Sequence, residues 1–356
     1  MPDTMQRTID ALAARQCTRG GVKEVVLCLH IEAGNTTLNA ASGQWRGEPI
    51  GAQTPHFIAS TSKLFATAMV MRLRHEGRLD LDDPVLRFFP AGELNGLHRI
   101  SGTDHTPAIT VRHLLSHTSG LPDYFEGRRR DGTRLADGLL AGRDMSFGLD
   151  EAVAWSRDEM RPHFPPGTGR RALYSDTNFY LLGEVIARAH RGPLPRALSE
   201  LVTGPLGLRH THFSSAGLEA LPMRFREATL NIPRAMASMP VDGGIVSTGS
   251  DMLAFTRAFF SGALFPRAWL AEMADWRRVF FPLHAGIGML QFRLPRLLSP
   301  WRRMPVLLGH SGISGAFAFH CPERGIALAG TVNQIANRSR PYRFMLEVLE
   351  ALRTKG

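Results

Sequence analysis

Apolar and polar residues follow different periods at the two ends of the chain and in its middle. Residues 4–15 have the spacing of a short amphipathic helix, and residues 25–31 read as a strand that turns at Gly34-Asn35 into a second strand. Towards the other end we expect four further strands and a final helix, around 286–293 and over 305–313, 317–320, 326–332 and 342–353. Strands joined by tight turns pair antiparallel, so both ends of the chain are predicted to share one sheet.

The middle of the chain is predicted to be mostly helical. Residues 79–84 resemble a helix start, a short helix is expected within 109–122, and an amphipathic helix runs over 179–189. Another helix, capped at Ser250-Asp251, is expected to end near Phe260, and the Arg- and Gly-rich stretch 126–148 reads as a surface excursion.

These patterns predict an α+β fold with two subdomains. Residues 1–80 and 236–356 would form a discontinuous unit with an antiparallel sheet flanked by helices. Residues 81–235 would form an inserted, mostly helical subdomain, with the active site at the interface between the two.

One predicted helix is apolar on almost every side. It follows a short extended lead-in, starts at Ser60, reaches about Arg74 and is stopped by Gly77. A helix that is hydrophobic all round is normally buried at the centre of a domain. The polar exceptions are Ser60 and Lys63, which are three residues apart and therefore share a face.

Ser60 and Lys63 together indicate nucleophilic catalysis. A hydroxyl at a helix N-terminus meets free backbone N–H groups and the positive end of the helix dipole. All but three of the 42 Lys and Arg residues are arginines, which stay protonated, so a lysine here is notable. Partial desolvation would let its amine lose a proton well below the usual pKa of about 10.4. The alternative is an N-cap serine followed by an ordinary surface lysine.

Composition and charge exclude several other classes of protein. The net charge of +10 comes from scattered arginines without an aromatic-interleaved basic stripe, so we expect no nucleic-acid partner. Three cysteines without C-x-x-C spacing argue against a disulfide scaffold or zinc knuckle and fit a reducing compartment. With no signal-peptide pattern and no apolar run of about 18 residues, the protein is expected to be cytoplasmic, without an integral membrane segment.

Histidine pairs at two places have a spacing that suits a metal ion. His113 and His117 are four residues apart, and His210 and His212 are two apart. Neither pair has a nearby carboxylate or third histidine to complete a site, so we predict no metal.

Three short motifs, Ser60-Thr61-Ser62-Lys63, Tyr174-Ser175-Asp176 and His310-Ser311-Gly312, follow one another along the chain. In order and spacing they resemble the motifs of the serine β-lactamase and penicillin-binding-protein-like superfamily, in the branch with class C β-lactamases, D-stereospecific peptidases and related esterases. The resemblance covers about residues 20 to 350 and implies a β-lactamase/transpeptidase-like fold. Supporting stretches are 113–122, 164–167, 205–207 and 243–248.

The resemblance also implies roles for single residues. Ser60 would be acylated, and Lys63 and Tyr174 would share the general-base work, with the dominant base left open. Backbone N–H groups of Ser60 and Ile313 would form the oxyanion hole. Substrate would dock along a strand edge next to Asp176, His310, Ser311 and Gly312, with the glycine leaving room for it.

Two positions depart from the pattern of this superfamily. Asp176 stands where lactamases usually carry asparagine; an ionised aspartate only accepts hydrogen bonds, so it would suit a substrate amine or would hold Lys63. His310 replaces a lysine whose fixed charge helps to hold a substrate carboxylate, and a largely neutral histidine grips it less. Both departures weaken the case for β-lactam resistance.

We therefore expect a serine acyl hydrolase that acts, without metal or cofactor, on a carboxylic ester or small D-amino-acid-type amide. One alternative is a β-lactamase or D-Ala-D-Ala carboxypeptidase, and another is a catalytically silent binding or assembly protein on the same scaffold. An α/β-hydrolase is disfavoured because the chain has no G-x-S-x-G motif. The sequence does not predict the oligomeric state.

The stretch 292–303 is basic, apolar and interrupted by prolines, and it precedes the third motif. Our hypothesis is that it borders the pocket and sorts substrates, perhaps towards apolar acyl groups. The alternative is a surface loop packed on the core.

Overall fold

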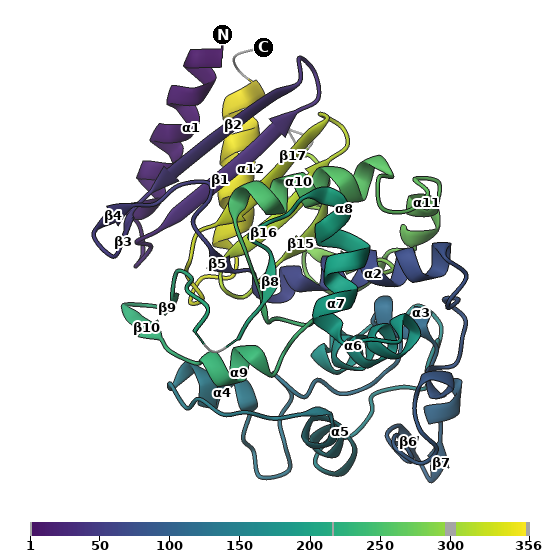
Figure 1. The fold of residues 1–356 in the computed structure, drawn as a ribbon. Coiled ribbons are helices and arrows are strands. Elements are labelled where there is room, and N and C mark those ends of the chain that lie inside the picture. Colours follow the sequence, from purple (N-terminus) through teal and green to yellow (C-terminus); the bar gives the residue numbers. More distant parts are fainter. Residues whose placement is uncertain (1, 216, 296–303, 354–356) are drawn as a thin grey trace.

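An eight-stranded antiparallel sheet forms the frame of the computed structural model, which describes residues 2–215, 217–295 and 304–353 (Figure 1). The strand order is β12-β13-β14-β15-β16-β17-β1-β2. The first two strands are β1 (Val25–Ile31) and β2 (Thr36–Ser42). The others are β12 (Arg277–Phe280), β13 (Leu283–Ala285), β14 (Leu290–Phe292), β15 (Leu307–Ser311), β16 (Ala316–Cys321) and β17 (Ile326–Thr331).

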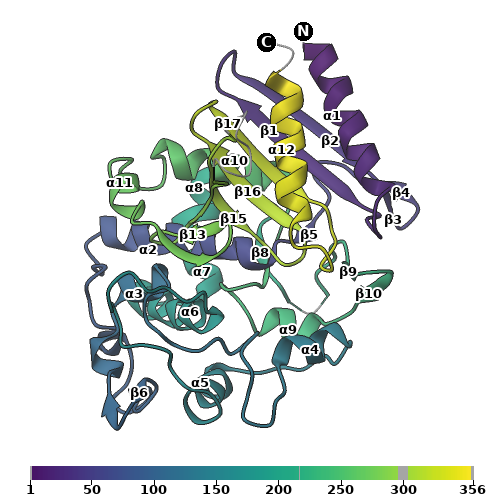
Figure 2. The same cartoon turned by 180° about the vertical axis from the view of Figure 1, so that it is seen from behind.

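The two ends of the chain meet in this sheet, as predicted. β1 forms a hairpin with β2 across Gly34-Asn35, and on its other side it pairs with β17, Leu29 facing Leu328. Helices α1 (Pro2–Cys17) and α12 (Arg340–Arg353) cover one face of the sheet (Figure 2). The opposite face carries α10 (Gly249–Ser261). The α+β prediction and the strand and helix predictions at both ends are confirmed.

The apolar helix lies at the centre of the molecule as α2 (Ser62–His75). Every residue from Ser62 to Met71 is buried, in a core shared with α6 (Asp176–His190) and α10. The helix begins later than predicted, because Ala59–Thr61 form a 3-10 turn that contains Ser60. Ala59 has φ +45°, so a strained left-handed residue sets the direction of the chain just before Ser60.

Residues 79–110 contain less helix than predicted. Asp80, Asp82 and Asp83 form turns, because Asp83 Oδ2 accepts the Asp80 N–H at 2.7 Å and Asp80 Oδ1 accepts the Asp82 N–H at 3.0 Å. Aspartates that bind nearby backbone in this way favour turns as readily as helix starts. Only a 3-10 turn (Val85–Phe88) and a small hairpin, β6 (Arg99–Ile100) with β7 (Thr103–Asp104), follow before Thr106.

The predicted surface excursion at 126–148 is partly wrong. It contains α4 (Leu135–Leu140), whose Leu135, Ala136 and Leu139 are buried while Asp137 is exposed. These side chains contact residues far away in the sequence, on the hairpin β9 (Met223–Phe225) and β10 (Ala228–Leu230), within a third core cluster. Because that partner is distant, the local pattern did not show the burial.

The remaining elements complete the middle of the chain. Its helices are α3 (Val111–Leu115), α5 (Leu149–Asp158), α7 (Leu194–Leu198), α8 (Gly204–Leu206), α9 (Pro233–Ala237) and α11 (Trp269–Met273). A three-stranded sheet joins β5 (His56–Phe57), β11 (Ile245–Ser247) and β8 (His212–Phe213). The predicted subdomain boundaries at 80/81 and 235/236 stay a prediction. Among the described helices, none combines the length and apolarity needed to cross a bilayer.

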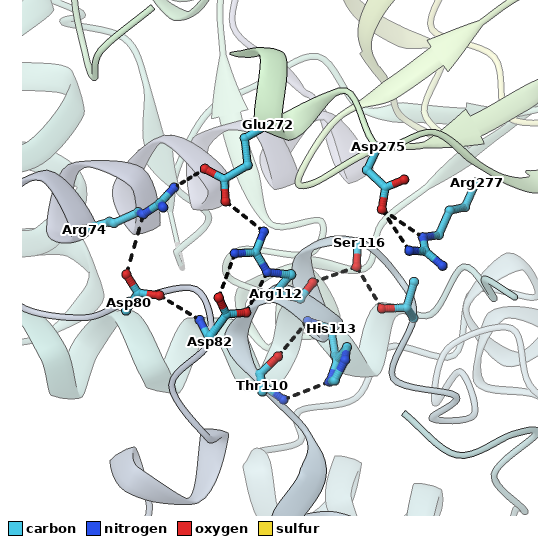
Figure 3. Close-up of polar contacts among 11 residues, drawn as sticks. Arg74, Asp80, Asp82, Thr110, Arg112, His113, Ser116, Glu272, Asp275 and Arg277 are labelled. Atoms are coloured by element: carbon cyan, nitrogen blue, oxygen red, sulfur yellow. Dashed lines mark hydrogen bonds and ion pairs between the residues drawn. The ribbon is translucent and has the colours of Figure 1, made fainter. Parts of the chain in front are cut away.

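An ion-pair network fixes the end of α2 that lies away from Ser60 (Figure 3). Arg112 on α3 binds both carboxylate oxygens of Asp82 at 2.7 and 2.9 Å and reaches Glu272 on α11 at 2.9 Å. Glu272 in turn accepts from Arg74 on α2 at 2.7 Å. One glutamate thus ties together two helices that are otherwise separated by the loop 76–110.

Candidate active site

The side chains of Ser60, Lys63 and Tyr174 meet at the start of α2. Ser60 comes from the 3-10 turn, Lys63 from the first turn of the helix, and Tyr174 from the loop before α6. The Tyr174 phenol is hydrogen-bonded to the side chains of both Ser60 and Lys63. The structure therefore brings together the three residues that were predicted as catalytic.

Lys63 is completely buried and is held by two oxygen atoms. Its Nζ lies 2.5 Å from Oδ1 of Asp176 and 2.6 Å from the backbone oxygen of Asp242. Desolvation lowers the pKa of Lys63, but the charges of Asp176, Tyr174 and Asp242 outweigh it and raise the pKa above its usual value. The predicted fall in the pKa of this amine is therefore wrong, because the helix meets a carboxylate as well as apolar residues.

The phenol of Tyr174 also keeps its proton in the resting site. Burial raises its pKa above the usual range, and Asp176 adds to the rise, while the Lys63 ammonium opposes it. The ring stacks on His117 with centroids 4.5 Å apart, and Phe280 stands edge-on to it at 6.1 Å.

His117 supports the loop that carries Tyr174. Its Nδ1 accepts the backbone N–H of Ser175 at 3.2 Å and lies 3.2 Å from the side-chain amide of Asn178. Burial and the nearby Lys63 charge hold the pKa of His117 well below its usual value, so the ring is neutral. The sequence reasoning considered His117 only as a metal ligand, although it lies in one of the stretches that support the resemblance.

The third motif divides its side chains between the two faces of the sheet. The His310 ring faces Tyr174, with centroids 6.1 Å apart, while Ser311 Oγ lies 2.5 Å from the Tyr342 hydroxyl on α12. A Cβ on Gly312 would lie 2.2 Å from the backbone oxygen of Ile58. This glycine thus allows close approach of the chain segment that leads to Ser60, and the Ser311 hydroxyl is engaged on the far face.

His310 is a neutral, buried ring. Its Nδ1 lies 2.8 Å from the backbone oxygen of Ser311 and is assigned as the donor there, whereas its buried Nε2 has no partner. Burial and the charge of Lys63 lower the pKa of His310 to about 3. It therefore cannot supply the fixed positive charge that a lysine provides at this position.

An apolar pocket opens beside Ser60. It encloses about 580 Å³ of empty space, including its mouth, and Ile313 lines it. Its polar side chains are Ser60, Asp176 and Asp242. Most of its wall is built from Phe125, Ala136, Leu139, Leu140, Met223, Leu230, Ile232, Met236, Met239 and Ile335. The pocket can take a bulky apolar group next to the hydroxyl of Ser60.

A buried ion pair anchors the β9–β10 wall of the pocket to the main sheet. Arg224 on β9 bonds to Glu24 with a shortest distance of 2.5 Å, and the Glu24 side chain is 2% exposed. The Asn333 amide donates to the same carboxylate at 3.0 Å. Gln334 adds hydrogen bonds to both the backbone N–H and oxygen of Arg226.

Asp242 is a site residue that the sequence reasoning missed. It is buried, its Oδ2 accepts the Tyr124 hydroxyl, and its Oδ1 has no hydrogen-bond partner. Burial and the neighbouring Asp176 raise the pKa of its carboxyl to about 7, against the opposing effect of Lys63. Its position before Gly243-Gly244 was no signal, since Tyr124 and Asp176 reach it only through the fold.

The hypothesis for residues 292–303 cannot be followed through that stretch. Residues 296–303 lie outside the described part of the chain, and Phe292 ends β14 in the core against α12. Among the described residues no cluster of His, Cys, Asp and Glu has the arrangement of a metal site.

Comparison with known proteins connects this geometry to a family. A family model described as Beta-lactamase matches residues 5–352. Esterase EstB of Burkholderia gladioli is 35% identical over 185 residues, 51% of this chain and 44% of that protein. D-alanyl-D-alanine-carboxypeptidase/endopeptidase AmpH of Escherichia coli (strain K12) is 26% identical over 60% of this chain and 51% of its own. The chain thus spans about half the length of these curated relatives.

Two solved structures match over nearly their whole length. D-amino acid amidase from Ochrobactrum anthropi SV3 is 25% identical, with a TM-score of 0.80 over 99% of both chains. A D-stereospecific amidohydrolase from Streptomyces sp. is 26% identical, with a TM-score of 0.73 over 99% of this chain and 98% of that one.

Proposed function

The chain belongs to the β-lactamase family of serine hydrolases, and we propose that it cleaves a carboxylic ester or small amide through an acyl-enzyme on Ser60. The observation that carries the proposal is the Tyr174 phenol bonded to both Ser60 and Lys63 at the edge of an apolar pocket. A nucleophile in contact with its proton acceptor is the arrangement that acyl transfer needs.

In this proposal Lys63 and Tyr174 work as one base. The deprotonated form of the pair takes the proton of Ser60 while its oxygen attacks the carbonyl carbon. The negative charge that develops on the carbonyl oxygen is assigned to the backbone N–H groups of Ser60 and Ile313. The pair then protonates the leaving alcohol or amine, which departs, and water activated by the same pair hydrolyses the acyl-enzyme and restores Ser60.

Asp176 acts on this base through charge. Its carboxylate raises the pKa of both Lys63 and Tyr174, so whichever group carries the missing proton, deprotonation becomes harder. In return, the ion pair at 2.5 Å fixes the amine beside Tyr174. We assign Asp176 as a positioning residue for Lys63.

The pocket and His310 guide the choice of substrate. Apolar walls favour a bulky apolar acyl group, and a neutral His310 gives little hold on a substrate carboxylate. The names of the relatives, an esterase and D-amino acid amidases, fit an ester or small amide. The name of the carboxypeptidase AmpH keeps D-Ala-D-Ala peptides among the substrates to be tested.

The deciding experiment is labelling with a fluorophosphonate probe, followed by mass mapping of the adduct. We expect the adduct on Ser60 and no labelling of S60A. Turnover assays with p-nitrophenyl esters, amino acid amides, nitrocefin and a D-Ala-D-Ala peptide then identify the reaction, and we expect esters or amides to be cleaved fastest. A folded protein that takes no label and cleaves none of these would be a catalytically silent binding protein. The predicted cytoplasmic location is part of the same proposal and is tested by cell fractionation.

A further inference from the structure

We propose that the carboxylate of Asp242 is a subsite for a substrate ammonium, so that the enzyme takes esters or amides of acyl groups with both a bulky apolar side chain and a free amine. The inference rests on the proposed function, since it places the amine in the pocket next to Ser60. It assigns to this site a recognition residue outside the three motifs.

The first argument is that Asp242 has an unused acceptor inside the pocket. The residue is 3% exposed and lines the cavity together with Ser60. Its Oδ1 is buried without a hydrogen-bond partner. A buried carboxylate oxygen without a partner is costly, and a ligand that donates a hydrogen bond to it recovers that cost on binding.

The second argument is that Asp242 is held ready while its neighbour is occupied. Tyr124 donates its hydroxyl to Oδ2 and is fixed in turn by the rings of Phe147 and Tyr180, so the carboxylate has one orientation. Asp176, the other acid in the pocket, already faces Lys63 at 2.5 Å. Of the two acids that line the pocket, Asp242 therefore has the available oxygen.

The third argument is the charge at the base of the pocket. Lys63 faces two carboxylates, Asp176 and Asp242, and meets the second only through its backbone oxygen. Arg338, whose charge also acts on Asp176, is hydrogen-bonded to Glu126 at 3.2 Å. One positive charge from a ligand would balance the second carboxylate, whereas an anionic ligand would be repelled.

The walls of the pocket define the rest of the ligand. Their side chains are apolar, so they offer the body of a ligand no hydrogen-bonding partner. Three are methionines, Met223, Met236 and Met239, which adapt to apolar groups of different shape. An amine that carries an aromatic or branched aliphatic side chain fits both parts of the pocket.

The test measures binding to S60A, which removes turnover from the readout. The ligands are phenylalaninamide, of either hand, and 3-phenylpropanamide, which has the same apolar body without the amine. We expect S60A to bind the better hand of phenylalaninamide at least about tenfold more tightly than 3-phenylpropanamide by titration calorimetry. Equal affinities would overturn the proposal.

Variants then locate the effect. In the S60A background, D242N should remove the preference for the amine, and Y124F, which frees the carboxylate to turn, should reduce it. The matched control is D137N, which changes an exposed acid on the outer side of α4 and should keep the preference. If D242N does not fold, the comparison of S60A with Y124F still decides: an unchanged amine preference in Y124F contradicts the assignment.

These outcomes separate this inference from the proposed function. A protein that is labelled on Ser60 but binds both amides equally keeps the proposed function and loses the Asp242 subsite. One that prefers the amine but takes no label keeps the subsite and loses the hydrolase.

Discussion

Oδ1 of Asp176 lies 2.5 Å from Nζ of Lys63, and both side chains are almost fully buried. The carboxylate stands at a position where related lactamases usually carry a neutral amide. It converts a lysine that burial alone would discharge into one that holds its proton, and it makes the nearby phenol harder to ionise.

We expect kcat/KM of the wild-type enzyme to keep rising with pH into the alkaline range. The pKa values of Lys63 and Tyr174 both lie above their usual values, and the reaction needs the pair to have lost a proton. In D176N the negative charge that raises both is gone, so the midpoint of the rise should move down by about 1 pH unit or more. The measurement is hydrolysis of p-nitrophenyl acetate against pH, corrected for the spontaneous reaction. An unchanged or higher midpoint would show that Asp176 does not act on the base.

Removing either part of the nucleophile–base contact should abolish most of the activity. S60A is expected to lower kcat by roughly 10³-fold or more, and Y174F by roughly 10²- to 10⁴-fold, without a matching loss of stability. Single-turnover kinetics with an activated ester separate acylation from later steps. Y180F is the control, because Tyr180 is another mostly buried tyrosine that lies outside the Ser60 contact. A Y174F enzyme as active as Y180F would exclude Tyr174 from proton transfer.

Narrowing the pocket should discriminate between substrates by size. L139W fills space at the buried face of α4, so kcat/KM for p-nitrophenyl octanoate should fall at least about tenfold relative to that for the acetate. The readout is the ratio of the two substrates, which a general loss of folded protein does not change. If both esters slow equally, the acyl chain does not occupy this pocket.

Breaking the anchor of the pocket wall should destabilise the protein strongly. E24Q leaves Arg224 without its counter-charge at a site where the two side chains are 17% and 2% exposed, and the loss should be about 3–5 kcal/mol in free energy of unfolding. E347Q is the control, since its ion pair with Arg15 is far more exposed and should cost less than about 1 kcal/mol. Urea denaturation followed by circular dichroism compares the two. Equal, small losses would mean that the Glu24 pair is not an anchor.

Features determined by neighbouring residues could be predicted from the sequence. The hairpin at Gly34-Asn35 follows from its turn residues, and the all-round apolar α2 reads as a buried helix because its own side chains say so. The three motifs likewise predicted which side chains of Ser60, Lys63 and Tyr174 would meet.

Features that depend on distant partners could not. The burial of α4 is created by a hairpin about 90 residues away, and the state of Lys63 is decided by Asp176 after the fold has brought them together. Asp242 carries no local pattern at all, because its partner Tyr124 lies 118 residues earlier in the chain. The aspartates at 80–83 show the opposite problem, since a helix start and a turn use the same side chains.

The pairing of β1 with β17 has a consequence for how the protein is made. Leu29 faces Leu328, so the hairpin that leaves the ribosome first lacks its neighbouring strand until about 300 further residues have been translated. Throughout that interval its apolar edge is open to other nascent chains. Synthesis of this enzyme should therefore depend on chaperones that shield the N-terminal hairpin, and a truncated transcript should yield an insoluble product.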